Sequence, residues 1–143
     1  MKLTIVRIGK IREPYILAAE NHYLTMLPAL KIITLKGKDD VQKDSQEVIN
    51  RLAAERNVYI LAEIGKPHDS LAFAQMVQPY LQGLEEATLV IAGPFGWYYE
   101  ILPAAWHRLS LSPLTFPHEL AYIVLLEQIF RANKISKGQK YHY

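Results

Sequence analysis

Short apolar, β-prone runs alternate with helical stretches along this chain, and this alternation limits the fold more than any other feature of the sequence. The predicted strands are residues 3–8, 30–35, 58–61, 88–92 and a short run at 108–111. The predicted helices are residues 14–26, 42–54, 70–81, a short helix after Trp97, and a last helix at about 117–135. This order is typical of an α/β fold with a mostly parallel sheet flanked by helices.

The chain is long enough for one domain with a continuous core. It has 143 residues, of which 50% are apolar, and it contains no internal repeat and no linker that resembles a domain boundary. We therefore expect a single domain over residues 1–143. Pro14 suits a first helical turn, and Asp69 or Ser70 suits an N-cap, so two of the helix starts are marked locally.

The composition argues against several classes of protein. There is no cysteine, and the five histidines lack the close pairing of zinc motifs, so a metal enzyme is not expected. The N-terminal apolar run is too short for a signal peptide, and no segment has the length of a membrane span. We expect a soluble cytoplasmic protein with no metal and no membrane partner.

A loop rich in glycine and proline follows the most apolar predicted strand. Residues 87–92 lead directly into Gly93-Pro94-Phe95-Gly96, which lacks the first glycine of a dinucleotide fingerprint and does not fit a phosphate loop. In open α/β sheets, ligands bind at the carboxyl ends of the strands, where this loop would lie. Two glycines would let the backbone approach a ligand closely, although an ordinary tight turn has the same composition.

The last predicted helix changes character along its length. Its first half is apolar nearly all round, which indicates burial on several sides. A second copy of the chain would cover such a helix, so we predict a homodimer; a central core helix of a monomer is the alternative. In the second half, Glu127 and Arg131 are spaced for an intrahelical ion pair.

The end of the chain is basic and aromatic. From residue 128 onward it has no acidic residue and carries four cations and two tyrosines, namely Arg131, Lys134, Lys137, Lys140, Tyr141 and Tyr143. Such groups can contact phosphates and stack on unpaired bases, but a solvated tail has the same composition. The net charge of +2 is too small to indicate a nucleic-acid partner by itself.

Three segments together carry a resemblance to a known family. They are Ala92-Gly93-Pro94-Phe95-Gly96, Leu111-Ser-Pro-Leu-Thr-Phe-Pro-His118 and Tyr141-His142. They resemble the Gly-Gly-Pro-Glu-Gly loop, the Leu-Ser-x-x-Thr-x-Pro-His segment and the terminal Tyr-His of the ribosomal RNA large subunit methyltransferase H family, within the SPOUT superfamily. The resemblance extends over nearly the full length.

The resemblance implies a fold, a reaction and a substrate. The family threads its two C-terminal loops through each other as a deep trefoil knot, an exception to the rule against threading. Its members bind S-adenosylmethionine in that knot and methylate N3 of a pseudouridine in 23S rRNA, here expected in the assembled ribosome. The implied cofactor-binding residues are Leu61, Gly93, Ser112, Pro113, Leu114, Thr115, Phe116 and Pro117. A valine in place of Gly93 is therefore expected to block cofactor binding.

The resemblance also implies candidates for catalysis, which are His118, Arg131, Tyr141 and His142. The terminal Tyr-His is expected near the cofactor across a dimer interface. Local hydrogen bonding in the first helical turn is an alternative role for His118, and pairing with Glu127 is an alternative role for Arg131. Leu114 and Phe116 are candidates to cover the adenine, although isolated apolar residues more often belong to a core.

Three positions depart from the family pattern. Phe95 stands in place of a glutamate, Tyr122 in place of an arginine, and Ala62 in place of an aspartate. These departures keep an alternative function open, in which a catalytically weak member serves as a ribosome-binding or assembly module. An unrelated small-molecule binding domain would require the loop and tail matches to be coincidental.

Overall fold

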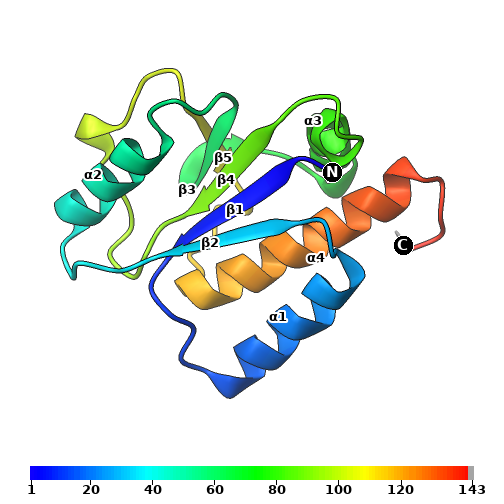
Figure 1. Cartoon of the computed structure of the whole chain (residues 1–143), viewed down its shortest axis with the longest axis horizontal. Helices are drawn as coiled ribbons and strands as arrows, with labels where there is room; N and C mark the ends of the chain where they lie inside the picture. Colours follow the sequence, from blue (N-terminus) through cyan, green and yellow to red (C-terminus); the bar gives the residue numbers. More distant parts are fainter. Residues whose placement is uncertain (142–143) are drawn as a thin grey trace.

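The computed structural model describes residues 1–141 as one sheet with helices on both faces (Figure 1). The strands are β1 (Leu3–Ile8), β2 (Lys31–Leu35), β3 (Val58–Pro67), β4 (Ala87–Ile91) and β5 (His107–Ser110). The helices are α1 (Pro14–Met26), α2 (Val41–Leu52), α3 (Ser70–Leu81) and α4 (His118–Ser136), with a 3₁₀ turn η1 (Tyr99–Ile101) between β4 and β5.

The five strands form a parallel sheet in the order β2-β1-β4-β3-β5. The strand β4 lies in the middle of the sheet, and all five of its residues are buried, as expected for a parallel strand covered on both faces. The predicted α/β class with a mostly parallel sheet is confirmed. The carboxyl ends of all five strands point to the same edge of the sheet, where part of β3 and the loops after β4 and β5 meet.

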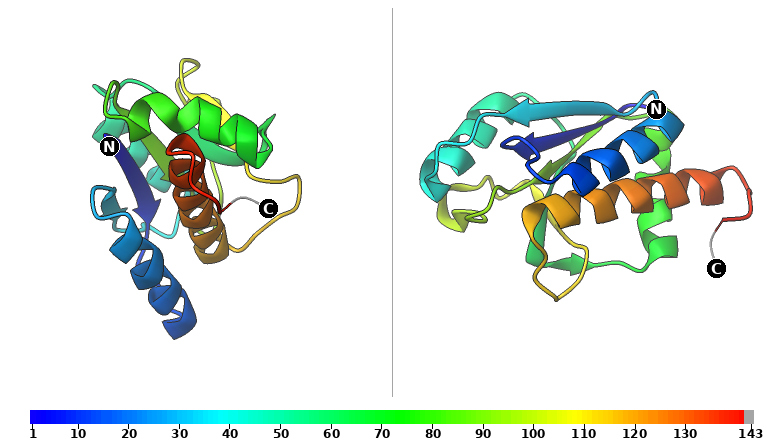
Figure 2. Two further views of the ribbon diagram at one scale, coloured as in Figure 1. Left: turned by 90° about the vertical axis from the view of Figure 1, so that its right-hand side faces the viewer. Right: turned by 90° about the horizontal axis from the view of Figure 1, so that it is seen from below.

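The two faces of the sheet have separate cores. On one face, Ile5 and Leu89 pack with Val77 of α3 and Leu125 of α4. On the other face, Val6 and Val90 pack with residues of α2 and with the indole of Trp97. Figure 2 shows α1 and α4 side by side along the first face. Because side chains alternate between the faces of a strand, each inner strand contributes to both cores.

Most of the predicted elements are confirmed to within a residue or two. The helices α1 and α3 have the predicted bounds, Pro14 begins α1, and the side chain of the N-cap Asp69 accepts a hydrogen bond of 2.7 Å from Ala72 N. Two expectations need correction. The element after Trp97 is a single 3₁₀ turn, and β3 continues six residues past Leu61 to Pro67, through residues that its apolar run does not include.

None of the helices within residues 1–141 combines the length and the apolar character that crossing a bilayer requires. The same part of the chain has no cluster of three or more histidine, aspartate or glutamate side chains suited to hold a metal ion.

Candidate functional site

A cavity of about 820 Å³ lies at the carboxyl edge of the sheet, between the second half of β3 and the loops that follow β4 and β5. A volume of this size is in the range of sites for small molecules and cofactors. Of the eight residues predicted to bind a cofactor, seven line this cavity: Leu61, Gly93, Ser112, Leu114, Thr115, Phe116 and Pro117. Pro113 belongs to the same loop as five of them but is not part of the lining. The structure thus brings together residues that are up to 56 positions apart in the sequence.

The loop after β4 forms a tight turn that is fixed to the rest of the molecule. Gly93 and Gly96 form an isolated antiparallel bridge, and Gly96 N donates a hydrogen bond of 3.1 Å to Gly93 O. Gly96 has a φ of +75°, a conformation that favours glycine. The buried indole of Trp97 then donates a hydrogen bond of 2.7 Å to Leu61 O, and Tyr98 N donates to Ser45 Oγ at 2.9 Å. Both bonds join the loop to distant elements.

A side chain in place of Gly93 was expected to crowd the cofactor directly, but its Cβ atom would approach the protein. A Cβ atom at this position would lie 3.3 Å from Ile8 Cγ2 and 3.7 Å from Asp44 Oδ2. These atoms belong to the core face that α2 covers, so a larger residue at position 93 would first push against the protein. The expected effect of a valine on a ligand is therefore indirect, through displacement of the loop.

One wall of the cavity is formed by β3 itself, at an irregularity in the strand that the sequence did not predict. Leu61 and Lys66 both pair with Leu109 of β5, so residues 62–65 form a bulge between them. Gly65 lies at its base, where a Cβ atom would be 2.6 Å from the Arg108 carbonyl carbon. Only a glycine fits there. Within the described residues, Glu63 of this bulge is the one acidic side chain in the lining of the cavity.

The loop between β5 and α4 forms a third wall of the cavity, and local hydrogen bonds hold this loop in place. Ser110 Oγ donates to Ser112 O at 3.0 Å, and Leu114 N donates to Ser112 Oγ at 3.0 Å. The Leu114 side chain is 69% exposed, so it does not belong to a core, whereas Phe116 is half-buried. The hydroxyl and backbone groups of this loop are the kind of polar partners that can orient a largely apolar ligand.

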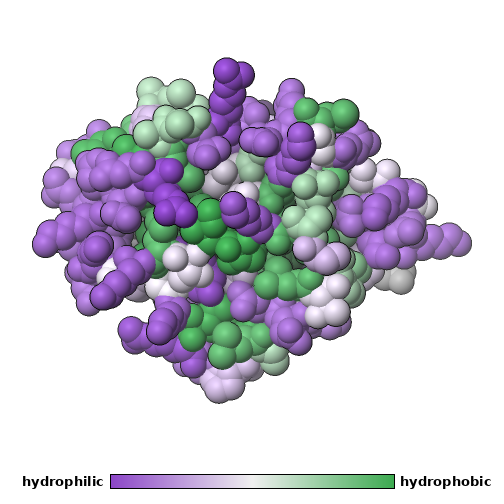
Figure 3. All heavy atoms as spheres, in the orientation of Figure 1, coloured by the Kyte–Doolittle hydropathy of each residue, from purple (hydrophilic) through white to green (hydrophobic). Residues whose placement is uncertain are grey.

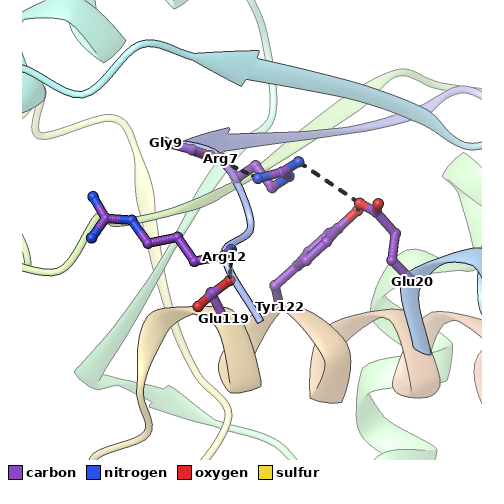
Figure 4. A network of polar contacts seen from close by, with 6 residues as sticks. All are labelled: Arg7, Gly9, Arg12, Glu20, Glu119 and Tyr122. Atoms are coloured by element: carbon purple, nitrogen blue, oxygen red, sulfur yellow. Dashed lines mark hydrogen bonds and ion pairs between the residues drawn. The ribbon is translucent and has the colours of Figure 1, made fainter. Parts of the chain in front are cut away.

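The start of α4 is fixed by a network of polar contacts beside the cavity (Figure 4). His118, the first residue of α4, lines the cavity. Glu119 Oε1 accepts a hydrogen bond of 2.7 Å from Arg12 N, and Tyr122 OH donates one of 2.5 Å to Glu20 Oε2. The Arg7 guanidinium lies 5.2 Å from the centre of the Tyr122 ring. Tyr122 is therefore a core residue that joins α1, α4 and β1.

Burial changes the acidity of two tyrosines near the cavity. Burial, followed by the hydrogen bond to Glu20, raises the pKa of Tyr122 above its ordinary range. Partial burial also raises the pKa of Tyr99, which lines the cavity; the nearby charge of Glu63 adds to this rise, and the charge of Arg108 opposes it. Both side chains therefore remain neutral hydrogen-bonding groups at neutral pH.

Two other predicted catalytic residues, Arg131 and Tyr141, lie at the far end of α4. Arg131 Nη2 donates a hydrogen bond of 2.6 Å to Glu127 Oε1, which confirms the predicted ion pair. The Arg131 guanidinium lies 4.9 Å from the centre of the Tyr141 ring, which also packs edge-on against Phe130. His142 lies outside the described residues.

Among the described residues of one chain, His118 does not meet the other candidates for catalysis, Arg131 and Tyr141. His118 and Arg131 are thirteen residues apart in a continuous helix, which corresponds to about 20 Å along its axis. Figure 2 shows residues 137–141 at the end of α4 opposite to its first turn. The cavity and His118 thus form one group, and Arg131 and Tyr141 form another.

Sequence reasoning missed Glu63 and Ile64 as cavity residues, because the apolar run that marks β3 ends at Ala62. The Gly65-Lys66-Pro67 segment would have been the available signal, since a glycine after a strand can mark a bulge.

Comparison with known proteins identifies relatives over the whole length. Residues 1–142 match a family described as predicted SPOUT methyltransferase. The chain is 40% identical to ribosomal RNA large subunit methyltransferase H of Pseudothermotoga lettingae and 34% identical to the protein of that name from Kosmotoga olearia, in each case over 100% of both chains. It is 38% identical to the Prochlorococcus marinus protein of the same name, over 96% of this chain and 93% of that one.

Proposed function

This chain belongs to the SPOUT methyltransferase family, and we propose that it transfers a methyl group from S-adenosylmethionine to N3 of a pseudouridine in 23S rRNA of the assembled ribosome. The observation that carries the proposal is the cavity at the carboxyl edge of the sheet, lined by seven of the eight residues that the family resemblance assigns to the cofactor. The names of the relatives favour this enzyme over a ribosome-binding or assembly module without activity.

The cavity fits the proposed cofactor in size and in chemistry. S-adenosylmethionine combines a flat adenine ring with a ribose, a positive sulfonium and a charged amino-acid end. The lining offers apolar side chains, the backbone of the Gly93–Gly96 turn and the Ser112 hydroxyl. Glu63 provides the acidic group among the described lining residues, and a carboxylate is suited to the positive groups of the cofactor. When bound, the cofactor supplies an electrophilic methyl group.

The protein contributes positioning and control of a proton. The fixed turn after β4 and the loop at residues 112–117 form two sides of the cavity and would hold the cofactor there, and methyl transfer requires a base that enters in line with the methyl group. N3 of a uracil-like ring is a weak acid and must lose its proton during the reaction. His118 at the cavity is one candidate to accept this proton, and a cationic group such as Arg131 would favour the N3 anion.

A homodimer would unite the two groups of residues. One side of α4 is incompletely covered, since Leu120 is 42% exposed and Ala121 and Val124 on the same side are half-buried. Exposed apolar side chains also occur on the neighbouring α1, where Leu17 is 47% exposed. Figure 3, seen from the side of β2, shows apolar residues between charged and polar ones on that face of the molecule. The incompletely covered apolar side chains of α4 and α1 are suited to cover by a second copy.

The positions along α4 suggest how the two copies would be arranged. His118 and Arg131 are equally distant from the point between Val124 and Leu125. A two-fold axis crossing α4 near that point would bring the partner subunit's Arg131 level with His118. Tyr141 would follow toward the cavity of the other copy, which agrees with the role that the family resemblance implies for the terminal Tyr-His.

The trefoil knot is also part of the proposal. The chain passes from the central strand β4 to the edge strand β5 and then returns to the opposite part of the sheet as α4. The loops on both sides of β5 line the same cavity. This path supports a threaded arrangement of the kind that the family adopts.

The direct test of the function is methyl transfer to purified ribosomes that lack methylation of 23S pseudouridines. Labelled S-adenosylmethionine is supplied, and the modified nucleotide is mapped. The proposal expects label at N3 of one pseudouridine. Cofactor binding without transfer to any nucleotide would contradict it and favour the assembly module.

A further inference from the structure

Three large apolar side chains are exposed at the cavity, one on each of its walls. Ile64 of the β3 bulge is 69% exposed, Phe95 of the loop after β4 is 57% exposed, and Leu114 of the loop before α4 is 69% exposed. A cluster of exposed apolar side chains around a cavity usually marks a surface that a ligand or partner covers. Phe95 is the aromatic residue of the three, and it stands where the family pattern has a glutamate.

The protein holds the Phe95 backbone in a defined position. The bridge between Gly93 and Gly96 closes the turn that carries it. One residue after that turn, the Trp97 indole is anchored to Leu61 O, and Tyr98 N is anchored to Ser45. The exposure of Phe95 therefore results from a fixed turn. A ring with two rotatable side-chain bonds also loses little conformational entropy when a ligand covers it.

The geometry of methyl transfer indicates which part of the substrate would contact the Phe95 ring. The attacking nitrogen must approach the methyl carbon to about 3–3.5 Å, so the target base has to enter the cavity that holds the cofactor. The cofactor is assigned to Leu61, to the loop at residues 112–117 and to Gly93, and Phe95 follows Gly93 in the same turn with a side chain that is 57% exposed. The base must therefore pass the exposed side chains at the mouth. Unpaired RNA bases are commonly held by stacking on aromatic rings.

The chemistry of the turn favours a base over a phosphate. Residues 93–97 are Gly-Pro-Phe-Gly-Trp and carry no charge. A phosphate would require cations or a series of free amides, whereas the flat and uncharged face of a pyrimidine matches an aromatic ring.

We propose that Phe95 is the surface on which the RNA base that receives the methyl group stacks, and that it is thus a specificity-determining residue of this enzyme. The proposal rests on the proposed function. It assigns to position 95 a stacking contact with RNA, which the glutamate of the family pattern cannot make.

The test compares three substitutions of Phe95 with one remote control. Phe95→Tyr keeps the ring, Phe95→Leu keeps an apolar side chain without a ring, and Phe95→Ala removes both. The control is Leu84→Ala, because Leu84 is 74% exposed and lies in the turn before β4, at the opposite edge of the sheet. For each variant, kcat and the KM for undermethylated ribosomes are measured, together with the dissociation constants of S-adenosylmethionine and of the dimer.

The expected result is specific to RNA. Phe95→Ala and Phe95→Leu raise the KM for ribosomes by about ten-fold or more, the range expected for loss of one base–aromatic stack. Phe95→Tyr and Leu84→Ala stay within about two-fold of the wild type. Cofactor affinity and dimer affinity change little in all four variants.

Several outcomes would overturn the proposal. A Phe95→Leu variant with wild-type KM would mean that the ring is not needed. A loss of cofactor affinity would place Phe95 against S-adenosylmethionine, and a loss of dimer affinity would place it against the partner. A failure of the proposed function would be distinguishable, because the wild-type protein itself would then transfer no methyl group to 23S rRNA.

Discussion

The two ends of α4 differ in their surroundings, although both carry residues predicted to act in catalysis. At the first end, His118 lines a cavity, and contacts from α1 and from the segment before it fix the helix. At the second end, Arg131 pairs with Glu127 and lies against the Tyr141 ring, which packs on Phe130. The first end lies at the cavity, whereas Arg131 and Tyr141 are not among the residues that line it. This difference is the main structural argument for a site shared by two subunits.

The largest effect on the free energy of unfolding is expected from a bulky side chain in place of Gly65, which lies near the cavity. Gly65→Val would place side-chain atoms against the backbone of Arg108 and Leu109, where even a Cβ atom would be within 2.8 Å. Because backbone cannot move aside cheaply, we expect a loss of at least about 3 kcal/mol in the free energy of unfolding, measured in urea. The control at the tail end is Gly138→Ala, since Gly138 has open space around it and a φ of +66°. It should cost about 1 kcal/mol. Equal losses would contradict the close approach at Gly65.

A smaller effect is expected when the turn after β4 loses its anchor. Trp97→Phe removes the hydrogen bond to Leu61 O and leaves a buried carbonyl oxygen without that donor. The free energy of unfolding should fall by about 1–3 kcal/mol, and cofactor affinity, measured by calorimetry, should fall with it. Stability lost with unchanged cofactor affinity would show that the position of this turn does not matter to the site.

Alkaline pH should weaken the network at the start of α4. The pKa of Tyr122 is raised above its ordinary value of 10.0, chiefly by burial, so the folded protein keeps a proton that the unfolded chain loses. The stabilising contribution is complete below pH 10 and is lost as the pH rises above it, by up to about 1.4 kcal/mol per pH unit for this group. Urea unfolding between pH 9 and 11 should show a shallower decline in Tyr122→Phe than in the wild type. An unchanged slope would contradict the assignment.

The smallest effect on stability is expected at the tail end of α4. Glu127→Gln removes the ion pair with Arg131, a contact between residues four apart on a helix surface. The free energy of unfolding should fall by only about 0.5 kcal/mol. The rate of methyl transfer should change more than stability does, because Glu127 fixes the position of the Arg131 guanidinium. A large loss of stability with unchanged transfer would assign the pair to folding.

The sequence predicted the sheet well because its strands are short apolar runs between clear helical patterns. The bounds of α1 and α3 were correct where Pro14 and Asp69 mark the first turns. The bulge of β3 could not be predicted, since residues 62–65 are held by pairing with β5, a contact that no local pattern encodes. Tertiary contacts decided that part of the fold.

The candidate site was predictable only in part. The Gly93–Gly96 loop pointed to the edge of the sheet, but its tie to Leu61 depends on the Trp97 indole, which sequence reasoning did not consider. In the sequence, Tyr122 stands out only as a departure from the family pattern, in place of an arginine. It is instead buried and bonded to Glu20, 102 positions away. Such a pairing follows from the packing of α1 on α4 and has no sequence signal of its own.

The most direct test of the shared site is complementation between two inactive variants. His118→Trp would fill the cavity of one chain, and deletion of residues 141–143 would remove the tail of the other. When the two proteins are unfolded together and refolded as mixed dimers, half of the dimers are hybrids, and each hybrid has one complete site if the tail acts across the interface. The account predicts recovery of about a quarter of the wild-type rate of methyl transfer to undermethylated ribosomes. A mixture no more active than its separate components would contradict it.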